Sequence, residues 1–204
     1  VHSNQQWARD TEEFKSMVGP NSRDLQETTL RLVYDRLVFM MKKIQVANAD
    51  TTAVFLPTGD LYEIQSHDIM INQLNGNPLD GSLNQLYLRI KEDGQVSFTP
   101  LIGSNAKSTF AYNEHQLQWS GVYKSITYQV DFQLAENVWF WRVRLKGSGK
   151  ADIVYGQDLG NAAKGAVQSN EAYISQYIDH HVTESEGRIT VSSRQNQPQG
   201  GRFP

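Results

Sequence analysis

The amino-acid sequence predicts a mainly β protein, an antiparallel β-sandwich preceded by a helical segment. From residue 50 onward apolar residues alternate with polar ones, which is the period of a strand with one buried face. Turn sequences rich in glycine, asparagine and aspartate recur about every ten residues, as in sandwiches. Before residue 44 the apolar residues instead follow the period of a helix. We therefore expect a helical leader or linker at residues 1–43 and a β-sandwich domain at residues 44–204.

The helical segment is predicted to contain one main helix, roughly at residues 23–43. The chain-breaking pair Gly19-Pro20 precedes it, and Asn21 or Ser22 can cap its first turn. The apolar residues with helical spacing are Leu30, Val33, Tyr34, Leu37, Val38, Met41 and Ile44. We expect this helix to pack within the protein, and the alternative is a helix that binds a partner.

The clearest strands form a predicted hairpin at residues 126–145. The residues expected on its buried face are Ile126, Tyr128, Val130, Phe132 and Leu134 on the first strand, and Trp139, Trp141, Val143 and Leu145 on the second. Between them, residues 135–137 form the expected turn. The loop-like sequence of residues 200–204 predicts that the sandwich is cut short at its C-terminal end.

Composition excludes several classes of protein. The 204 residues include no cysteine, so a disulfide scaffold, a thiolate zinc site and a cysteine nucleophile are ruled out, and a reducing cytoplasm is the expected compartment. A net charge of −3 leaves no excess of cations for a phosphate backbone, so we expect no nucleic-acid partner. The longest apolar run, residues 37–41, is far shorter than the ~20 residues that span a bilayer, so we expect no membrane association.

Three groups of side chains invite a chemical interpretation. His180 and His181 suggest a metal, but neighbours on a strand point to opposite faces, so we expect no metal site. Two of the carboxylates Asp152, Asp158, Glu171 and Asp179 could hydrolyse a glycosidic bond, although helix capping and strand-end hydrogen bonding are favoured. The tryptophans Trp119, Trp139 and Trp141 are expected to fill the core, with a sugar-stacking platform as the alternative.

The stretch at residues 168–180 is unusual because it mixes amide, carboxylate, phenol and imidazole groups. Such groups both donate and accept hydrogen bonds, as the hydroxyls of a sugar require. We interpret the stretch as a strand that is either a polar structural network or a surface facing carbohydrate. Strand alternation would place Gln176 and His180 on one side and Tyr177 on the other.

Several collinear motifs resemble a known family. They are FLPTGDLY at residues 55–62, MINQ at 70–73, NPLDGS at 77–82, WFW at 139–141, YGQD at 155–158 and SQYIDH at 175–180. In this order they resemble the N-terminal β-sandwich of glycoside hydrolase family 94 phosphorylases, in particular 1,2-β-oligoglucan phosphorylases and the phosphorylase-like part of cyclic β-1,2-glucan synthases. The resemblance covers roughly residues 50–204 and leaves out residues 1–43.

The resemblance implies a super-sandwich of the galactose-mutarotase type, joined in the parent enzyme to a helical linker, an (α/α)6 barrel and a small C-terminal region. In such enzymes inorganic phosphate attacks the anomeric carbon with inversion while an aspartic acid of the barrel protonates the leaving oxygen, which releases α-glucose 1-phosphate. It therefore implies no catalytic residue in this chain, no cofactor beyond phosphate as co-substrate, and inactivity of the chain alone. The implied partners are a β-glucan oligosaccharide and the catalytic barrel.

The resemblance also directs the choice of candidate substrate-binding residues. These are Gln176, Tyr177 and His180, supported by Asn170, Glu171 and Tyr173, with Arg194 and Gln197 on the following loop as weaker candidates. Truncated sheet edges would favour a homo-oligomer. Two rival functions remain: a free-standing carbohydrate-binding module and a complete small glycosidase.

Overall fold

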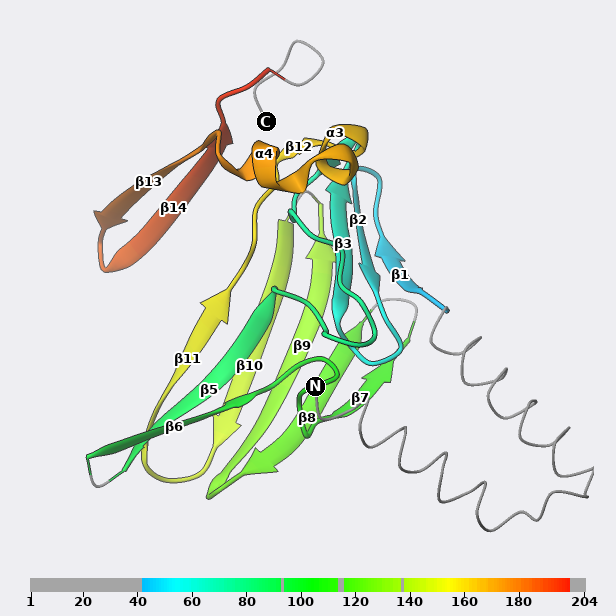
Figure 1. Cartoon of the computed structure of the whole chain (residues 1–204). Helices are drawn as coiled ribbons and strands as arrows, with labels where there is room; N and C mark the ends of the chain where they lie inside the picture. Colours follow the sequence, from blue (N-terminus) through cyan, green and yellow to red (C-terminus); the bar gives the residue numbers. More distant parts are fainter. Residues whose placement is uncertain (1–41, 93, 114–115, 137, 199–204) are drawn as a thin grey trace, which may run out of the picture.

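The computed structural model describes residues 42–92, 94–113, 116–136 and 138–198 (Figure 1). Within these ranges the chain is mainly β, every strand pairing is antiparallel, and the two helices are short. The predicted fold class is therefore confirmed. The helix predicted at residues 23–43 lies outside the described residues apart from Lys42 and Lys43, which are not helical.

The described strands form four sheets. The five-stranded sheet has the order β1-β2-β3-β4-β12, with β1 (Ile44–Ala47), β2 (Thr51–Phe55), β3 (Leu61–Ser66), β4 (Ile69–Met70) and β12 (Ala162–Ala163). The four-stranded sheet has the order β10-β9-β8-β7, with β7 (Thr109–Tyr112), β8 (Leu117–Tyr123), β9 (Ile126–Ala135) and β10 (Val138–Lys146). The three-stranded sheet has the order β11-β5-β6, with β5 (Gln85–Glu92), β6 (Gln95–Pro100) and β11 (Lys150–Gly156). The fourth sheet pairs β13 (Ile178–Ser185) with β14 (Arg188–Gln195).

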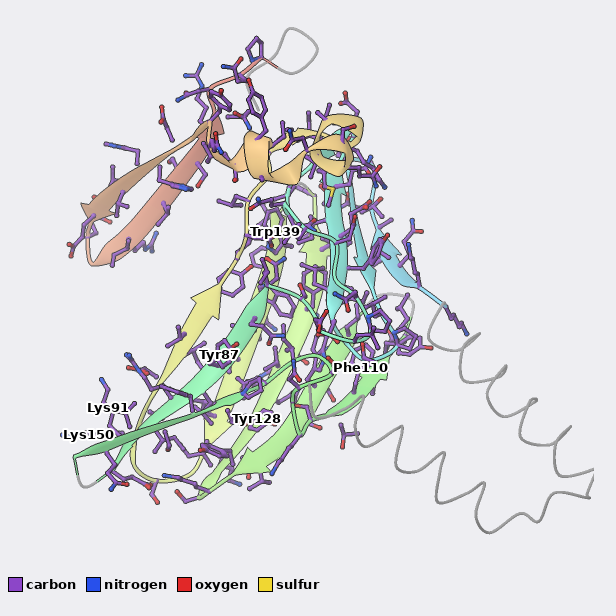
Figure 2. All side chains as sticks on the ribbon, in the orientation of Figure 1. Tyr87, Lys91, Phe110, Tyr128, Trp139 and Lys150 are labelled. Carbon is purple, nitrogen blue, oxygen red and sulfur yellow. The ribbon has the colours of Figure 1, made fainter. Side chains whose placement is uncertain are left out.

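The three larger sheets share one hydrophobic core. Phe55 of β2 is fully buried, and its ring lies 4.9 Å from that of Phe132 on β9 and 5.7 Å from that of Trp119 on β8. Leu88 of β5 brings the three-stranded sheet to the same cluster. On β9 the hydroxyl of Tyr128, labelled in Figure 2, hydrogen bonds with Oγ of Ser108 at 2.9 Å, which satisfies the polar atom of a ring buried in the core.

The predicted hairpin is confirmed as β9 and β10, whose register pairs Ala135 with Val138 and Phe132 with Trp141. One face of each strand packs on the core because apolar side chains occur at every second residue. Ile44, whose spacing also fitted the helical pattern of the preceding residues, begins β1. There Ile44 and Val46 alternate as core residues with exposed neighbours.

The strand predicted through residues 170–177 is wrong. Helix α4 (Glu171–Ser175) occupies most of this region, directly after α3 (Lys164–Ser169), and the strand begins only at Ile178. Val167 of α3 and Ile174 of α4 are both buried in one apolar cluster with Met70 and Ala162, so each short helix is held by one buried side chain. Tertiary packing therefore decides the local conformation here.

The hairpin of β13 and β14 extends away from the three larger sheets in Figure 1. Nearly all its side chains are exposed on both faces, including Val182, Ile189 and Val191.

Within the ranges that the structure describes, neither α3 nor α4 has the length and hydrophobicity of a membrane-spanning helix.

Candidate functional site

The first half of the predicted sugar-binding segment is helical. Asn170 precedes α4 and caps it, because its Oδ1 accepts a hydrogen bond from the backbone N–H of Tyr173 at 3.1 Å. Helix α4 begins at Glu171, and Gln176 follows its last residue with an exposed side chain. The predicted alternation of Gln176 and Tyr177 on a strand is therefore corrected.

Helix α4 brings two of the predicted aromatic residues together. The rings of Tyr173 and Tyr177 lie 4.8 Å apart between centroids, at 59° to each other, and half of the Tyr173 side chain is exposed. A hydrogen bond with Tyr173 raises the pKa of the Tyr177 phenol, and burial adds to the rise. The Tyr177 phenol is therefore neutral near pH 7, and the two hydroxyls can donate and accept hydrogen bonds beside the exposed Tyr173 ring.

The remaining predicted residues are divided between the two faces of the β13–β14 hairpin. His180 lies opposite Ser193, and its Nδ1 is 2.9 Å from the Ser193 hydroxyl. Arg194 was expected on a loop but lies in β14, opposite Asp179, which neighbours His180 and so points to the other face. Gln197 follows the hairpin and donates its backbone N–H to Oε1 of Gln195. The structure thus gathers Asn170, Tyr173 and Tyr177 and separates His180 from Arg194.

Sequence reasoning missed Gln195, which holds the hairpin to the rest of the domain. Its side chain is fully buried, and its Nε2 donates to the carbonyl oxygens of Gly160 at 3.3 Å and Ile174 at 3.1 Å. A glutamine within the sequence RQNQ, which is polar throughout, carries no signal that it is buried. Its role depends on contacts with residues 35 and 21 positions away.

Three of the four carboxylates considered for hydrolysis, Asp152, Asp158 and Asp179, have structural partners. Asp152 forms two hydrogen bonds of 2.7 Å with the guanidinium of Arg89, and these bonds hold the pKa of Asp152 below its usual range. Asp158 accepts hydrogen bonds from three N–H groups of other loops, and Asp179 accepts one from Asn196. The interpretation as hydrogen-bonding anchors is therefore favoured. No cluster of three or more acidic or histidine residues that could hold a metal occurs within the described ranges.

The three tryptophans considered above pack in or against the hydrophobic core. Trp119 is 1% exposed, and its ring stacks on Phe110 at 4.9 Å and contacts Trp141 at 5.6 Å. Trp139 and Trp141 are half-buried and pack against the same core. Packing outweighs the sugar-stacking alternative for this group.

A polar network on the outer face of the four-stranded sheet was also missed. At its centre the carboxylate of Asp131 is 1% exposed, and its Oδ1 accepts three amide N–H bonds of 2.9–3.0 Å. The donors are Gln116, Gln118 and Gln129, while Arg144 donates to Oδ2. Burial opposes ionisation of this carboxyl, but the hydrogen bonds and the guanidinium outweigh it, so the pKa of Asp131 lies below its usual range. We call these five residues the Asp131 network.

Comparison with known proteins identifies the family. The amino-acid sequence matches the SOGP N-terminal domain over residues 54–204. The chain belongs to the SOGP N-terminal domain family. It is also 42% identical over 165 residues to a 1,2-beta-oligoglucan phosphorylase of Listeria innocua serovar 6a. That alignment covers 81% of this chain and 15% of the phosphorylase, so the chain spans a small part of that relative's length.

In this SOGP N-terminal domain, several residues of the motifs that carried the resemblance hold loops in place by hydrogen bonds. Asp60 is fully buried, and its Oδ2 accepts hydrogen bonds from the Thr58 hydroxyl at 2.7 Å and the Ser104 N–H at 2.8 Å. Burial raises the pKa of Asp60, and these hydrogen bonds oppose the rise. Gly81 and Gly103 approach its Oδ1 so closely that a Cβ there would lie 2.8 and 2.0 Å away.

Asn72 and Asp158 complete this loop arrangement of the SOGP N-terminal domain. Asn72 is fully buried, accepts a hydrogen bond from the N–H of Ile64 at 2.8 Å and donates to the carbonyl of Leu74 at 2.6 Å. Asp158 accepts hydrogen bonds from the N–H groups of Gln73 and Leu74. The family motifs therefore contain residues that define loop geometry.

The SOGP N-terminal domain also has a polar hollow of 360 Å³ on the outer face of the five-stranded sheet. Its floor includes Glu63, which is almost fully buried and pairs with Lys164 of α3 at 2.6 Å. Asn75 donates a second hydrogen bond to Glu63 at 3.1 Å. The Glu63–Lys164 ion pair connects β3 to α3, so these two residues stabilise the packing of α3 in addition to lining the hollow.

Proposed function

We propose that this chain is the accessory N-terminal domain of a glycoside phosphorylase that cleaves β-1,2-linked glucans with inorganic phosphate and releases α-glucose 1-phosphate. The observation that carries the proposal is the 42% identity over 165 residues with a 1,2-beta-oligoglucan phosphorylase. The match of residues 54–204 to the SOGP N-terminal domain supports it. Membership of glycoside hydrolase family 94, a cytoplasmic location and the absence of a further cofactor belong to the same proposal.

In this proposal the domain shapes the substrate site, and the catalytic groups belong to a barrel elsewhere in the parent enzyme. The part of the domain that contacts sugar is the segment around α4. Tyr173 and Tyr177 offer adjacent phenols and ring faces, and Gln176 adds an exposed amide next to them. Side chains of this kind suit sugar hydroxyls because they donate and accept in neighbouring positions.

Phosphorolysis by the whole enzyme tests the proposal. Release of α-glucose 1-phosphate from β-1,2-linked gluco-oligosaccharides and phosphate is expected for the parent enzyme and not for this chain alone. Losing one hydrogen bond to a neutral hydroxyl costs about 0.5–1.5 kcal/mol, so Gln176→Ala or Tyr177→Ala in the parent should lower kcat/KM by about 2- to 12-fold.

Thr183→Ala, an exposed position further along the hairpin, is the matched control and should leave kcat/KM unchanged. Glucose 1-phosphate production by this chain alone would contradict the assignment of catalysis to the barrel. A parent enzyme that releases glucose but no glucose 1-phosphate would contradict phosphorolysis. Unchanged kcat/KM in both variants would show that the α4 segment has only a structural role.

A further inference from the structure

Four of the five residues of the Asp131 network lie on β8, β9 and β10 of the four-stranded sheet, and Gln116 directly precedes β8. In the register of this sheet, Asp131 of β9 is flanked by Gln118 on β8 and by Arg142 on β10. Side chains of directly paired residues share a face, so the network occupies the face opposite the core. The surrounding glutamines are partly buried, which limits the rotamers that they can adopt.

The carboxylate determines how the glutamine amides point. An ionised carboxylate only accepts hydrogen bonds, so each of the three amides must direct Nε2 toward Asp131. Their Oε1 atoms are consequently directed away from it. The result is a set of hydrogen-bond acceptors, two on strands and one directly before a strand, and a site supported by regular elements is held more precisely than one on loops.

Donors and an aromatic ring lie on the same face. Arg144 uses one nitrogen for Asp131 while its side chain remains 52% exposed, so further N–H groups are available at the surface. Arg142 is exposed opposite Asp131. Phe140, opposite Gln133, is 48% exposed and lies two residues before Arg142 on the same side of β10.

We propose that the Asp131 network and Phe140 form a binding surface for a neutral β-glucan oligosaccharide. Sugar hydroxyls would donate to the fixed amide oxygens and accept from the guanidinium groups, and a pyranose face would cover the Phe140 ring. The ionised carboxylate and the outward amide oxygens disfavour a polyanion, which the two arginines alone would attract. The identity of the sugar as a β-1,2-glucan rests on the proposed function, whereas the location of the surface rests on this geometry.

Binding of a β-1,2-linked glucotetraose to the 204-residue chain, measured by isothermal titration calorimetry, tests the surface. The wild-type chain should bind saturably, and Gln129→Ala should raise Kd by about 2- to 12-fold because one hydrogen-bonding amide is lost. Phe140→Ala should raise Kd by a similar factor, and removal of this exposed ring leaves the core intact. Gln95→Ala and Phe98→Ala are the matched controls, since both side chains are exposed on β6 of the other sheet.

Circular dichroism melting of each variant separates loss of binding from loss of folding. Failure of the wild-type chain to bind the tetrasaccharide, or equal Kd values for the Phe140 variant and its control, would overturn the proposal. Preference for a sulfated glucan over the neutral one would overturn it as well. The result is independent of phosphorolysis by the parent enzyme, so an active parent without this binding refutes only the surface, and binding without phosphorolysis refutes only the proposed function.

Discussion

Replacement of Asp158 should destabilise the domain by an amount that the structure allows to be worked out. The backbone N–H groups of Gln73 and Leu74 donate to its Oδ2 at 2.9 and 2.7 Å, and Asn84 Nδ2 donates to its Oδ1 at 2.6 Å. Hydrogen bonds to a charged group contribute about 1.5–3 kcal/mol each. The Leu74 bond is exposed and water can replace it, so the two partly buried bonds dominate. Asp158→Ala should therefore cost about 3 kcal/mol.

Urea unfolding followed by tryptophan fluorescence measures this loss, because Trp119 is 1% exposed in the folded state and becomes solvated on unfolding. A thermal midpoint about 6–12 °C lower should accompany it for a domain of this size.

Asp158→Asn is the informative companion variant. The side-chain oxygen of the new asparagine can keep the hydrogen bonds from the backbone N–H groups of Gln73 and Leu74. The side-chain amide of Asn84 can rotate by 180°, so that its Oδ1, which has no hydrogen-bond partner in the wild type, accepts from the new NH₂ group.

The asparagine variant should consequently lose only about 1 kcal/mol, the worth of an ordinary neutral hydrogen bond. Asp68→Ala removes an exposed carboxylate and serves as control, with an expected change within about 0.5 kcal/mol. The reasoning would be refuted by an Asp158→Ala variant as stable as the control. Equal losses for the alanine and asparagine variants would refute the account of the Asn84 flip.

Three further predictions concern the core and the buried carboxyls. Gly103→Ala should destabilise the domain by about 2 kcal/mol or more, because its φ is +80° and a Cβ would lie 2.0 Å from Asp60. Denaturant unfolding checks this against Gly94→Ala, which has a similar φ of +76° but no atom within 4 Å of the added Cβ and should therefore lose less stability. Phe55→Ala should cost about 3–5 kcal/mol by the same measurement, since a fully buried ring is removed. The lowered pKa of Asp131 stabilises the folded state above the unfolded pKa of about 3.9, and this contribution is lost as pH falls through the folded value. The stability difference between wild type and Asp131→Asn should therefore shrink below about pH 4; a difference that grows in acid would contradict the sign.

Local pattern was sufficient for the strands whose partners are close in sequence. Residues 126–146 alternate at every second position, and a short turn sets the register, so the hairpin of β9 and β10 follows from neighbouring residues alone. The polar residues Gln129, Asp131 and Gln133 alternate with the apolar ones on the first strand of that hairpin. The grouping of Asp131 with Gln116 and Arg144 required the pairing of three strands.

Tertiary structure decided the helices and the loop contacts. Helices as short as α3 and α4 have little stability of their own, so packing of Val167 and Ile174 on Met70 outweighs the strand-like composition of residues 170–177. Asp158 meets Gln73 across 85 residues and Asn84 across 74. Nothing near Asp158 in the chain indicates these partners, because a hydrogen bond between distant loops depends on the folded path of both. The sequence by itself therefore determined the β architecture and the family, while the positions of the polar groups that define its loops and surfaces were determined by the fold.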